Sequence, residues 1–499
     1  MIHLNRRRFL KYAGATTAVV GASALGLDLL STHSPLPSQQ STTAGIHQPP
    51  SIKNLQWTAT RTVNGKVYDG TISFQAEGAN SPVVGAELTF DPVYPQEIPM
   101  QAFTPESNRS YSFSSNAMTA DFTQTIPNLV GGKQYRAQVT VKDKYGGMNQ
   151  ANLDIPYVRE FENIAKMDTL LVGASYHPWW ENPCIHYCHW DELGANYSKG
   201  TTPLGTPLLG LYSSNDPLVI SKHIDWATGY GIDTFWCSYN GSNVADSYRM
   251  PPLMTNELIN DIKIAFLYET PTALGGPNED LSNVNLNSPS TYAVLESHFR
   301  TMASKYFSHP SYLKVNGRPV VYLYQSVSLA GDISSPITKL RKSIKNAHGL
   351  DLYLIGDEMN WDNTSQPSRL KAFDAITYYG LPHASFVDVV DKSPETARME
   401  YSRWQSAAHS VGVEIIPAPI PGHDDRNLCK LGVRKTCYSF PKSPEFFEAH
   451  MKVALDFVDK SRLMMIVSWD EWAENSFVEP TVEDGFKYLQ AICDTLAGH

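Results

Sequence analysis

The sequence predicts an α/β protein, a (β/α)8 TIM-type barrel with an N-terminal all-β, immunoglobulin-like sandwich domain. Three observations predict it: eight short apolar segments alternate with helical ones after residue 165, turn-separated strand patterns fill residues 51–160, and 499 residues suit two or three domains. We expect the boundaries at 1–33 for an export signal or anchor, 34–50 for a flexible linker, 51–160 for the sandwich and 165–499 for the barrel.

The N-terminal segment has the pattern of a twin-arginine export signal. Arg6 to Lys11 (RRRFLK) precedes a mild apolar stretch, Ala13 to Leu27, and Ala22-Ser23-Ala24 offers a cleavage site. The stretch is too short and too polar for a comfortable membrane span. We therefore expect export to an extracellular, periplasmic or cell-surface location, where an uncleaved segment would act as a membrane tether. The Ser-, Thr-, Gln- and Pro-rich run that follows is expected to be flexible.

Short strands separated by turns predict the sandwich. The stretches are Leu55 to Val63, Tyr68 to Gln75, Val84 to Phe90 and Tyr135 to Val141, with turns at Asn64-Gly65 and Gly146-Gly147. The run from Leu129 to Asp143 resembles the late hairpin of fibronectin-III and immunoglobulin-like domains, in which a corner tyrosine precedes an alternating strand. Nothing in this region indicates catalysis, so a spacer or substrate-presenting role is expected.

Eight nearly continuous apolar strands alternate with helices in the rest of the chain, which predicts a parallel sheet closed into a barrel. The strands are expected at Leu170 to Tyr176, Asp233 to Tyr239, Lys263 to Tyr268, Pro319 to Tyr324, Leu352 to Gly356, Ala375 to Tyr379, Glu414 to Pro417 and Met464 to Trp469. The clearest helix has Asp216 as N-cap and ends at Gly229, and another spans Val482 to Leu496. A doubly wound open sheet is the alternative, but no glycine-rich phosphate fingerprint follows any strand.

Composition narrows the class of ligand. The net charge is -10, which argues against a nucleic-acid partner because a phosphate backbone requires a basic face. Charged residues make up only 18 % and aromatic residues 11 % of the chain. An aromatic-rich, charge-poor surface favours a neutral ligand such as a sugar, so a polysaccharide or oligosaccharide is the expected partner.

Aromatic residues and carboxylates gather at the predicted strand ends. In a (β/α)8 barrel the catalytic groups come from the C-terminal strand ends and the loops after them. Aromatic faces stack on the apolar faces of sugar rings, and carboxylates accept hydrogen bonds from hydroxyls and transfer protons. These ends include Tyr176 to Trp180, Cys237 to Gly241, Tyr268-Glu269, Pro421 to Arg426 and Ser468 to Glu474. The combination predicts a carbohydrate site.

Glu471 and Glu474 are the principal catalytic candidates. They lie three residues apart just past an apolar strand, flanked by Trp469 and Trp472. Glycoside cleavage generally needs two carboxyl groups, one protonated and one ionised. Aromatic neighbours would desolvate one glutamate and raise its pKa, as a general acid requires. The alternative interpretation is a helix N-terminus that carries acidic residues because of the helix dipole.

A family resemblance favours the catalytic interpretation. The segment Trp469-Asp470-Glu471-Trp472-Ala473-Glu474, followed by Val478-Glu479-Pro480, resembles the Trp-Asn-Glu-Trp-x-Glu…Ile-Glu-Pro signature of glycoside hydrolase family 99, the endo-α-mannosidase and endo-α-mannanase family. Other stretches agree in their order along the chain: Tyr176-x-Pro178-Trp179, His189-Trp190, Gly210 to Asp216, Ser238-Tyr239-x-Gly241, Tyr268-Glu269, Val315 to Val321 and Pro421 to Arg426. The resemblance covers roughly residues 170–497 and excludes the sandwich.

The resemblance implies a barrel that acts on α-mannosidic linkages with retention and without a metal. It implies that Glu471 is a base on the sugar 2-hydroxyl and that Glu474 is the general acid/base on the glycosidic oxygen, with a 1,2-anhydro sugar between the two steps. This chain departs from the family pattern at three positions, which bear on sugar specificity: Asp470 stands where Asn is usual, Ala473 where His is common, and Tyr239 in place of a Trp.

Further residues are candidates for substrate binding. Aromatic residues at strand ends would line sugar subsites or simply pack; they are Tyr176, Trp179, Trp190, Tyr239, Tyr268, Trp469 and Trp472. Arg426 would donate hydrogen bonds to sugar hydroxyls or to a glutamate, or form a salt bridge at the barrel rim. Glu269 is a second acidic candidate that would otherwise pair with Arg or Lys.

The sequence contains six cysteines. Export permits disulfides, and both Cys429 with Cys437 and Cys184 with Cys188 share a loop, although connectivity does not follow from sequence. Cys237 and Cys493 are expected to be buried thiols. The Cys184 to His189 segment holds four potential zinc ligands but has no second ligand cluster at a recognised spacing. We therefore expect no metal and no cofactor.

The leading hypothesis is an exported retaining glycoside hydrolase that cleaves α-mannoside-type linkages in a polysaccharide or glycan. One alternative is a non-catalytic sugar-binding protein of the cell surface, with both domains as display modules. Another is an enzyme of surface-polysaccharide assembly built on the same barrel.

Overall fold

The structure is a computed structural model, and it describes residues 47–63, 65–94, 106–164, 169–186, 189–190, 205–275, 280–359, 367–379, 393–435 and 437–497. The expected export signal and most of the expected linker lie outside these residues. The chain divides into two units, Met1–His47 and Gln48–His499, and every element described below belongs to the second. In the part of the chain that is described, no helix has both the length and the apolar character needed to cross a bilayer.

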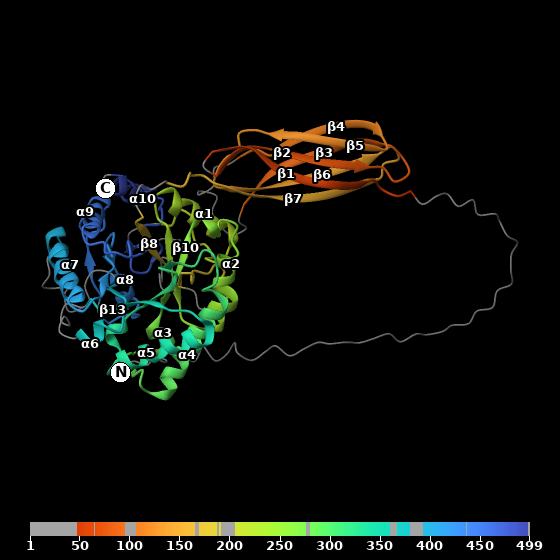
Figure 1. Ribbon diagram of the computed structural model, residues 1–499. Coiled ribbons are helices and arrows are strands. Elements are labelled where there is room, and N and C mark those ends of the chain that lie inside the picture. Colours follow the sequence, from red (N-terminus) through yellow and green to blue (C-terminus); the bar gives the residue numbers. More distant parts are fainter. Residues whose placement is uncertain are drawn as a thin grey trace, which may run out of the picture. The chain divides into compact units, whose positions relative to one another are not determined.

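The N-terminal part of the second unit is all-β, as predicted. Its strands are β1 (Ser51–Val63), β2 (Lys66–Glu77), β3 (Val83–Val93), β4 (Arg109–Ala117), β5 (Thr119–Ile126), β6 (Lys133–Asp143) and β7 (Met148–Val158). They form two antiparallel sheets in the orders β1-β2-β5 and β4-β3-β6-β7, drawn in red and orange in Figure 1. Alternate residues such as Ile72 and Phe74 from one sheet and Leu88 and Val139 from the other share one buried core.

Tyr135 fastens the start of β6 to the loop before it. Its hydroxyl accepts from the Val130 amide at 3.1 Å, lies 2.9 Å from the Val130 carbonyl and donates to Oε2 of Glu106 at 2.7 Å. This is the arrangement that a corner tyrosine makes in immunoglobulin-type sandwiches. The assignment of the domain to the immunoglobulin-like class itself stays a prediction.

The C-terminal part contains all eight predicted parallel strands. They are β8 (Leu171–Tyr176), β9 (Thr234–Tyr239), β10 (Lys263–Tyr268), β12 (Arg318–Leu323), β13 (Tyr353–Asp357), β14 (Ala375–Thr377), β15 (Glu414–Ile415) and β18 (Leu463–Ile466). Their order is β15-β14-β13-β12-β10-β9-β8-β18, with the short β11 (Lys314–Val315) antiparallel to β12. Such a sheet, surrounded by helices in Figure 1, is consistent with a (β/α)8 barrel.

Backbone hydrogen bonds join the two outer strands of this sheet. The amide of Met465 in β18 donates to the carbonyl of Pro417, and the amide of Val467 donates to the carbonyl of Pro419, both at 3.0 Å. The segment after β15 thus continues alongside β18 and closes the sheet. Proline lacks an N–H, so Pro417 and Pro419 can accept in this ladder but cannot donate, which explains why the regular strand ends at Ile415.

Helices and short elements connect the strands. The helices are α1 (Pro217–Gly229), α2 (Met250–Met254), α3 (Thr270–Leu274), α4 (Pro289–Lys305), α5 (Ser334–His348), α6 (Pro367–Leu370), α7 (Pro394–His409), α8 (Arg426–Lys430), α9 (Pro444–Leu455) and α10 (Lys487–Ala497). Shorter helical turns are η4 (Ala245–Arg249), η5 (Ile259–Asp261) and η7 (Ser326–Ser328), and β16 (His423–Asp424) pairs with β17 (Ser439–Phe440). The Asp216 side chain caps α1 by accepting from Leu218 N at 2.8 Å, as predicted.

The last helix begins later than predicted. The sequence pattern placed its start at Val482, whereas α10 begins at Lys487. A turn occupies the difference, because Thr481 Oγ1 accepts from the Asp484 amide at 2.9 Å and Gly485 has a φ of 56°, in the left-handed region.

The cysteines fall into disulfides and thiols. Cys429 and Cys437 are joined in the loop between β16 and β17, with their Cα atoms 6.0 Å apart. Cys184 is also disulfide-bonded, and its expected partner Cys188 lies outside the described residues. Cys237 is a buried thiol as predicted, whereas Cys493 is only half-buried because it lies on the outer part of α10.

Candidate active site

The pleat of the barrel strands decides which side chains reach the barrel mouth. Side chains alternate between the interior, where Trp236, Leu267 and Tyr322 pack together, and the layer between sheet and helices. In the parallel pairing of β9 with β10, Ser238 lies opposite Leu267, so the two strands end at the same height in the barrel. Continuing the interior series by two residues at each strand end selects the side chains that face the mouth: Ser238, Glu269, Tyr324, Asp357 and Tyr379.

Three predicted substrate-binding tyrosines belong to the opposite face. Tyr176, Tyr239 and Tyr268 are buried in the sheet–helix layer, one residue out of phase with the interior series. Tyr176 stacks on Phe235, its hydroxyl 3.2 Å from His223 Nδ1. The other two hydroxyls bond to Asp246, at 2.9 Å from Tyr239, and to His298, at 2.9 Å from Tyr268. We therefore assign these tyrosines to packing, and the expectation that they line sugar subsites is corrected.

Three of the predicted tryptophans also lie in the packed layer. Trp190, Trp469 and Trp472 are fully buried, and Trp472 donates from Nε1 to the Tyr212 hydroxyl at 3.1 Å. The expected tryptophan-walled cleft is thus not formed by the pair that flanks the glutamates, because Trp469 packs against His223 and Phe235 and Trp472 packs against Phe477. Trp179 differs from them, since it is half-buried and lies against the ring of His177, centroid to centroid 4.5 Å.

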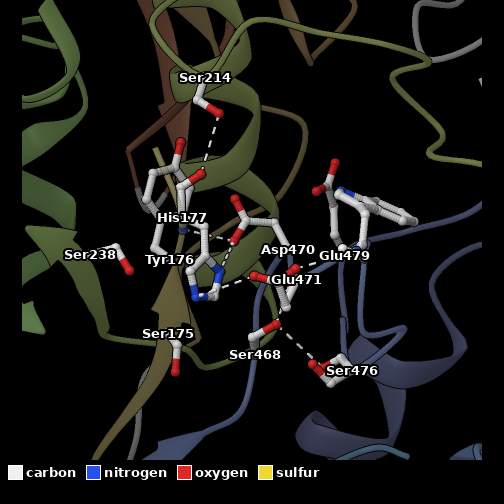
Figure 2. A network of polar contacts seen from close by, with 12 residues as sticks. Ser175, Tyr176, His177, Ser214, Ser238, Ser468, Asp470, Glu471, Ser476 and Glu479 are labelled. Carbon is white, nitrogen blue, oxygen red and sulfur yellow. Dashed lines mark hydrogen bonds and ion pairs between the residues drawn. The ribbon is translucent and has the colours of Figure 1, made fainter. Parts of the chain in front are cut away.

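His177 is the centre of a polar cluster at the mouth, which Figure 2 shows between the side chains of Asp470 and Glu471. Oδ1 of Asp470 accepts from the His177 amide at 2.8 Å and lies 2.9 Å from Nδ1. On the other side of the ring, Nε2 lies 2.9 Å from the Tyr379 hydroxyl and 3.9 Å from Oε2 of Glu471. A proton on Nδ1 satisfies Asp470 and leaves Nε2 to accept from Tyr379.

Burial sets the charges of this cluster. It lowers the pKa of His177 to about 3, so the imidazole is neutral at any pH near neutrality. Burial, followed by the nearby carboxylate of Glu479, raises the pKa of Asp470 well above its usual range. The Asp470–His177–Tyr379 chain is therefore a hydrogen-bonded support without a positive charge, and its His177 ring lies 3.9 Å from Glu471.

The loop after β18 presents Glu471 from a buried backbone. The Glu471 amide donates to Ser468 Oγ at 2.7 Å, and Glu471 Oε1 accepts from the Ala473 amide at 3.3 Å. The side chain of Glu471 is 9 % exposed, so it is nearly buried and does not extend into bulk water. Glu471 and Glu474 thus lie in a turn and not at the N-terminus of a regular helix.

Glu474 is held by an ion pair. Its Oε1 contacts Nη2 of Arg434, its Oε2 lies 3.9 Å from Nδ1 of His423, and its carbonyl accepts from the Asp424 amide at 2.8 Å. Burial opposes ionisation, but Arg434 and His423 outweigh it and hold the pKa of Glu474 below its usual range. Aromatic neighbours were expected to raise the pKa of one glutamate of the pair. For Glu474 the pKa is lowered instead, because Arg434 stabilises the carboxylate.

Both glutamates act on the same phenol. The pKa of Tyr379 is raised first by burial and then by the negative charges of Glu474 and Glu471. Tyr324, whose ring centroid lies 4.9 Å from that of Tyr379, is affected by Glu474 and by Glu269 in the same way. The negative charges of Glu471, Glu474 and Glu269 thus act on this pair of tyrosines at the mouth, and the catalytic roles of Glu471 and Glu474 stay a prediction.

Two further predicted residues take different positions. Glu269 lies at the mouth, where its Oε1 accepts from Ser238 Oγ at 2.5 Å. Arg426 pairs with Asp424, Nη2 to Oδ2 at 2.6 Å, and is 62 % exposed, which matches the expected rim salt bridge rather than a contact with a glutamate. The arginine of this loop that contacts a candidate catalytic glutamate is Arg434, eight residues further along the chain.

Sequence reasoning did not select His177, Tyr379, Asp470 or Arg434 as functional residues. His177 lies within the quoted Tyr176 to Trp180 stretch, and extending the strand alternation past β8 and β14 would have placed His177 and Tyr379 toward the interior. Arg434 lies in a long loop whose path has no periodic signature in the sequence, so nothing pointed to it.

Comparisons with known proteins agree with this description of the C-terminal part. Residues 288–492 match the family described as glycosyltransferase WbsX. Glycoprotein endo-alpha-1,2-mannosidase of Rattus norvegicus is 22 % identical over 350 residues, which cover 62 % of this chain and 68 % of the relative. A solved structure described as a glycoside hydrolase-like protein has a TM-score of 0.52 at 19 % identity, covering 67 % of this chain and 96 % of that one.

A solved endo-alpha-mannosidase of glycoside hydrolase family 99 from Bacteroides thetaiotaomicron has a TM-score of 0.49 at 18 % identity, covering 65 % of this chain and 95 % of that one. The C-terminal part of the chain is thus similar in sequence to endo-α-mannosidases, and its fold is that of a glycoside hydrolase-like barrel.

Proposed function

We propose that the barrel is a retaining glycoside hydrolase that cleaves α-mannoside-type linkages within a polysaccharide or glycan, with Glu471 and Glu474 as its catalytic residues. The observation that carries the proposal is that both carboxyl groups come from the same turn after β18, with Glu471 Oε2 3.9 Å from His177 Nε2 and Glu474 held in place by Arg434. The sequence similarity to endo-alpha-1,2-mannosidases supports the choice of linkage.

The proposed reaction has two steps and needs no cofactor. In the first, Glu471 takes the proton of the sugar 2-hydroxyl while that oxygen attacks C1, and Glu474 gives a proton to the departing glycosidic oxygen. In the second, Glu474 takes a proton from water, which opens the 1,2-anhydro ring at C1, and Glu471 returns its proton to O2. Two inversions at C1 give net retention.

The neighbours of Glu471 suit this role. The neutral His177 ring lies 3.9 Å from its Oε2 and brings no positive charge that would weaken a base. Trp179 is half-buried, with its ring stacked on His189 and lying against His177, and we propose that its accessible part contacts the apolar face of a sugar ring.

The test is a screen of purified protein on α-mannans, α-glucans and other polysaccharides, with new reducing ends counted and the anomer of the first product read by NMR. We expect cleavage of an α-mannan with retention. Glu474→Gln and Glu471→Gln should each lower the rate more than about 100-fold while the circular dichroism spectrum is unchanged. Near wild-type turnover by either folded variant would remove that residue from the mechanism.

A transferase is the second candidate, because residues 288–492 match a family described as glycosyltransferases. Such an enzyme of surface-polysaccharide assembly would pass a glycosyl group to a sugar hydroxyl instead of to water. Incubation with nucleotide sugars and mannan oligosaccharides separates the two candidates: chain extension without reducing-end release supports the transferase. Binding of the same sugars without either reaction supports the non-catalytic alternative.

We also propose that the protein is exported by the twin-arginine route, as the Arg6 to Lys11 pattern suggests. Two disulfide-bonded loops, at Cys184 and at Cys429–Cys437, suit an oxidising compartment. Replacement of Arg6 and Arg7 by Lys should leave the protein in the cytoplasmic fraction, and unchanged export would refute the proposal.

A further inference from the structure

A disulfide-closed loop reaches the barrel mouth from the side of Glu474. It leaves the barrel at β16, passes through the short α8 and returns at β17, and the Cys429–Cys437 bond closes it. Backbone bonds hold its turn, with the amides of Val433 and Arg434 both donating to the carbonyl of Leu428. Leu428 is buried, so the turn that carries Arg434 is anchored on the barrel.

Asp425 ties both ends of this loop to the Arg434 side chain. Its Oδ1 accepts from the Tyr438 amide at 2.6 Å, and its Oδ2 accepts from Nη1 of Arg434 at 2.8 Å. The other terminal nitrogen of the same guanidinium, Nη2, contacts Oε1 of Glu474. One planar cation therefore bridges a fully buried aspartate and a candidate catalytic glutamate that is 15 % exposed.

The other groups that face Glu474 do not replace this cation. His423, from β16, lies 3.9 Å away and also contacts Asp425, Nε2 to Oδ1 at 3.6 Å. The two tyrosines at the mouth, Tyr324 and Tyr379, are neutral phenols, and His177 is a neutral imidazole. Asp425 is itself a carboxylate whose charge opposes ionisation of Glu474.

We propose that Arg434 is a positioning residue for the proposed hydrolysis, which fixes the Glu474 side chain at the mouth as a carboxylate, and that the Cys429–Cys437 disulfide holds Arg434 in place. This inference rests on the proposed function for its catalytic meaning, but the ion pair and its effect on Glu474 are independent of it. Arg434 acts through Glu474 and sets the pH range in which that residue can donate a proton.

The sign of the effect follows from the role of Glu474. A general acid must be protonated before the first step, so the rate falls as the pH rises through its pKa, giving the basic limb of the profile. Because Arg434 lowers the pKa of Glu474, the basic limb of the profile lies at acidic pH. Without the guanidinium, burial and Asp425 are opposed by His423 alone, so the pKa of Glu474 rises and the basic limb moves to higher pH. The maximal rate falls because the side chain is less well held.

The direct test is titration of the Glu474 carboxyl in the full chain by NMR, with carbon-13 at the glutamate carboxyls and the resonance identified by its loss in Glu474→Gln. In Arg434→Gln the midpoint should rise by about one pH unit or more, as expected when an adjacent arginine is removed. Arg434→Lys should restore part of the shift. An unchanged midpoint in folded Arg434→Gln overturns the proposal whether or not the protein is a hydrolase.

The kinetic test uses the pH dependence of kcat/KM on whichever α-mannan the wild type cleaves. Arg434→Gln should move the basic limb upward by about one pH unit, whereas damage to the fold alone would lower the rate at every pH alike. Arg398→Gln is the matched control, because Arg398 forms an exposed ion pair with Asp456 on the outer helices. Absence of cleavage by the wild type would reject the proposed function and leave the titration to decide the role of Arg434.

The disulfide gives the second variant. Replacing Cys429 and Cys437 by Ser frees the loop without touching Arg434 or Glu474. We expect the Glu474 midpoint to rise in the same direction as in Arg434→Gln, with no additional rise when the two changes are combined. A midpoint identical to that of the wild type would show that the disulfide does not hold Arg434 against Glu474.

Discussion

One carboxylate oxygen of Asp470 receives two hydrogen bonds from His177, one from the backbone amide at 2.8 Å and one from Nδ1 of the ring at 2.9 Å. Because both hydrogen bonds end on Oδ1, Asp470 fixes the backbone just after β8 and the orientation of the imidazole ring at the same time. The ring then presents Nε2 to Tyr379 and to Glu471. The loop that carries the acids is thereby joined to the first and sixth barrel strands.

Asp470→Asn should be tolerated. Burial raises the pKa of Asp470 well above its usual range, which favours the uncharged form, and an asparagine oxygen can accept the same two bonds. We expect activity within about tenfold of wild type and no loss of thermal stability. Asp470→Ala leaves two buried donors unpaired and should cost about 1–3 kcal/mol of unfolding free energy, measured by denaturant titration.

His177→Phe should impair turnover more than binding. The variant keeps an aromatic ring beside Trp179 but removes the acceptor that orients the Tyr379 hydroxyl at 2.9 Å. We expect kcat to fall at least about tenfold with KM little changed, since a misplaced polar group at the reacting centre affects the transition state most. If KM rises and kcat is kept, His177 belongs to sugar binding rather than to support of the acids.

The sequence was sufficient for the barrel because each strand is a short apolar run between helical patterns, and all eight predicted strands are present. It was also sufficient to bring Glu471 and Glu474 to one end of the sheet, since strand ends of a parallel barrel meet there. The sequence left open whether the tyrosines line sugar subsites or pack, because the strand ends were treated as a whole, and the structure shows the packed alternative. The two-residue pleat separates Ser238, which faces the interior, from Tyr239, which faces the helices.

The partners of the two glutamates could not be predicted from sequence. Arg434 lies forty residues before Glu474 in the sequence. It reaches Glu474 because the chain between Asp425 and Tyr438 folds back on itself. The sequence contains two arginines in that loop and no rule that separates them. Only the loop path shows that Arg426 turns to Asp424 at the rim while Arg434 turns inward.

Trp179→Ala should weaken substrate binding. Trp179 is half-buried beside His177, unlike the fully buried Trp190, Trp469 and Trp472. Loss of an aromatic face of this kind is worth about 0.5–1.5 kcal/mol beyond its buried area, so we expect KM to rise roughly three- to tenfold with kcat nearly unchanged. Tyr145→Ala in the sandwich, where the side chain is 70 % exposed, is the control and should leave KM unaltered.

Asp357→Asn should change how stability depends on pH. Asp357 ends β13 at the mouth and accepts from the Gln325 amide at 2.8 Å, and burial, its main perturbation, raises its pKa to about 7. The folded state therefore holds a proton that the unfolded chain has released above about pH 4. Stability contributed by that proton is complete below pH 4 and is lost as the pH rises to about 7.

The loss would reach up to about 4 kcal/mol for a shift of this size, as an upper figure. An asparagine carries no proton to lose and still accepts from Gln325, so Asp357→Asn should be more stable than wild type at pH 8 and nearly equal to it at pH 4. Urea unfolding at the two pH values measures the difference, with the exposed Asp154→Asn as control. Equal gains at pH 4 and pH 8 would mean that Asp357 is ionised in the folded protein throughout this range.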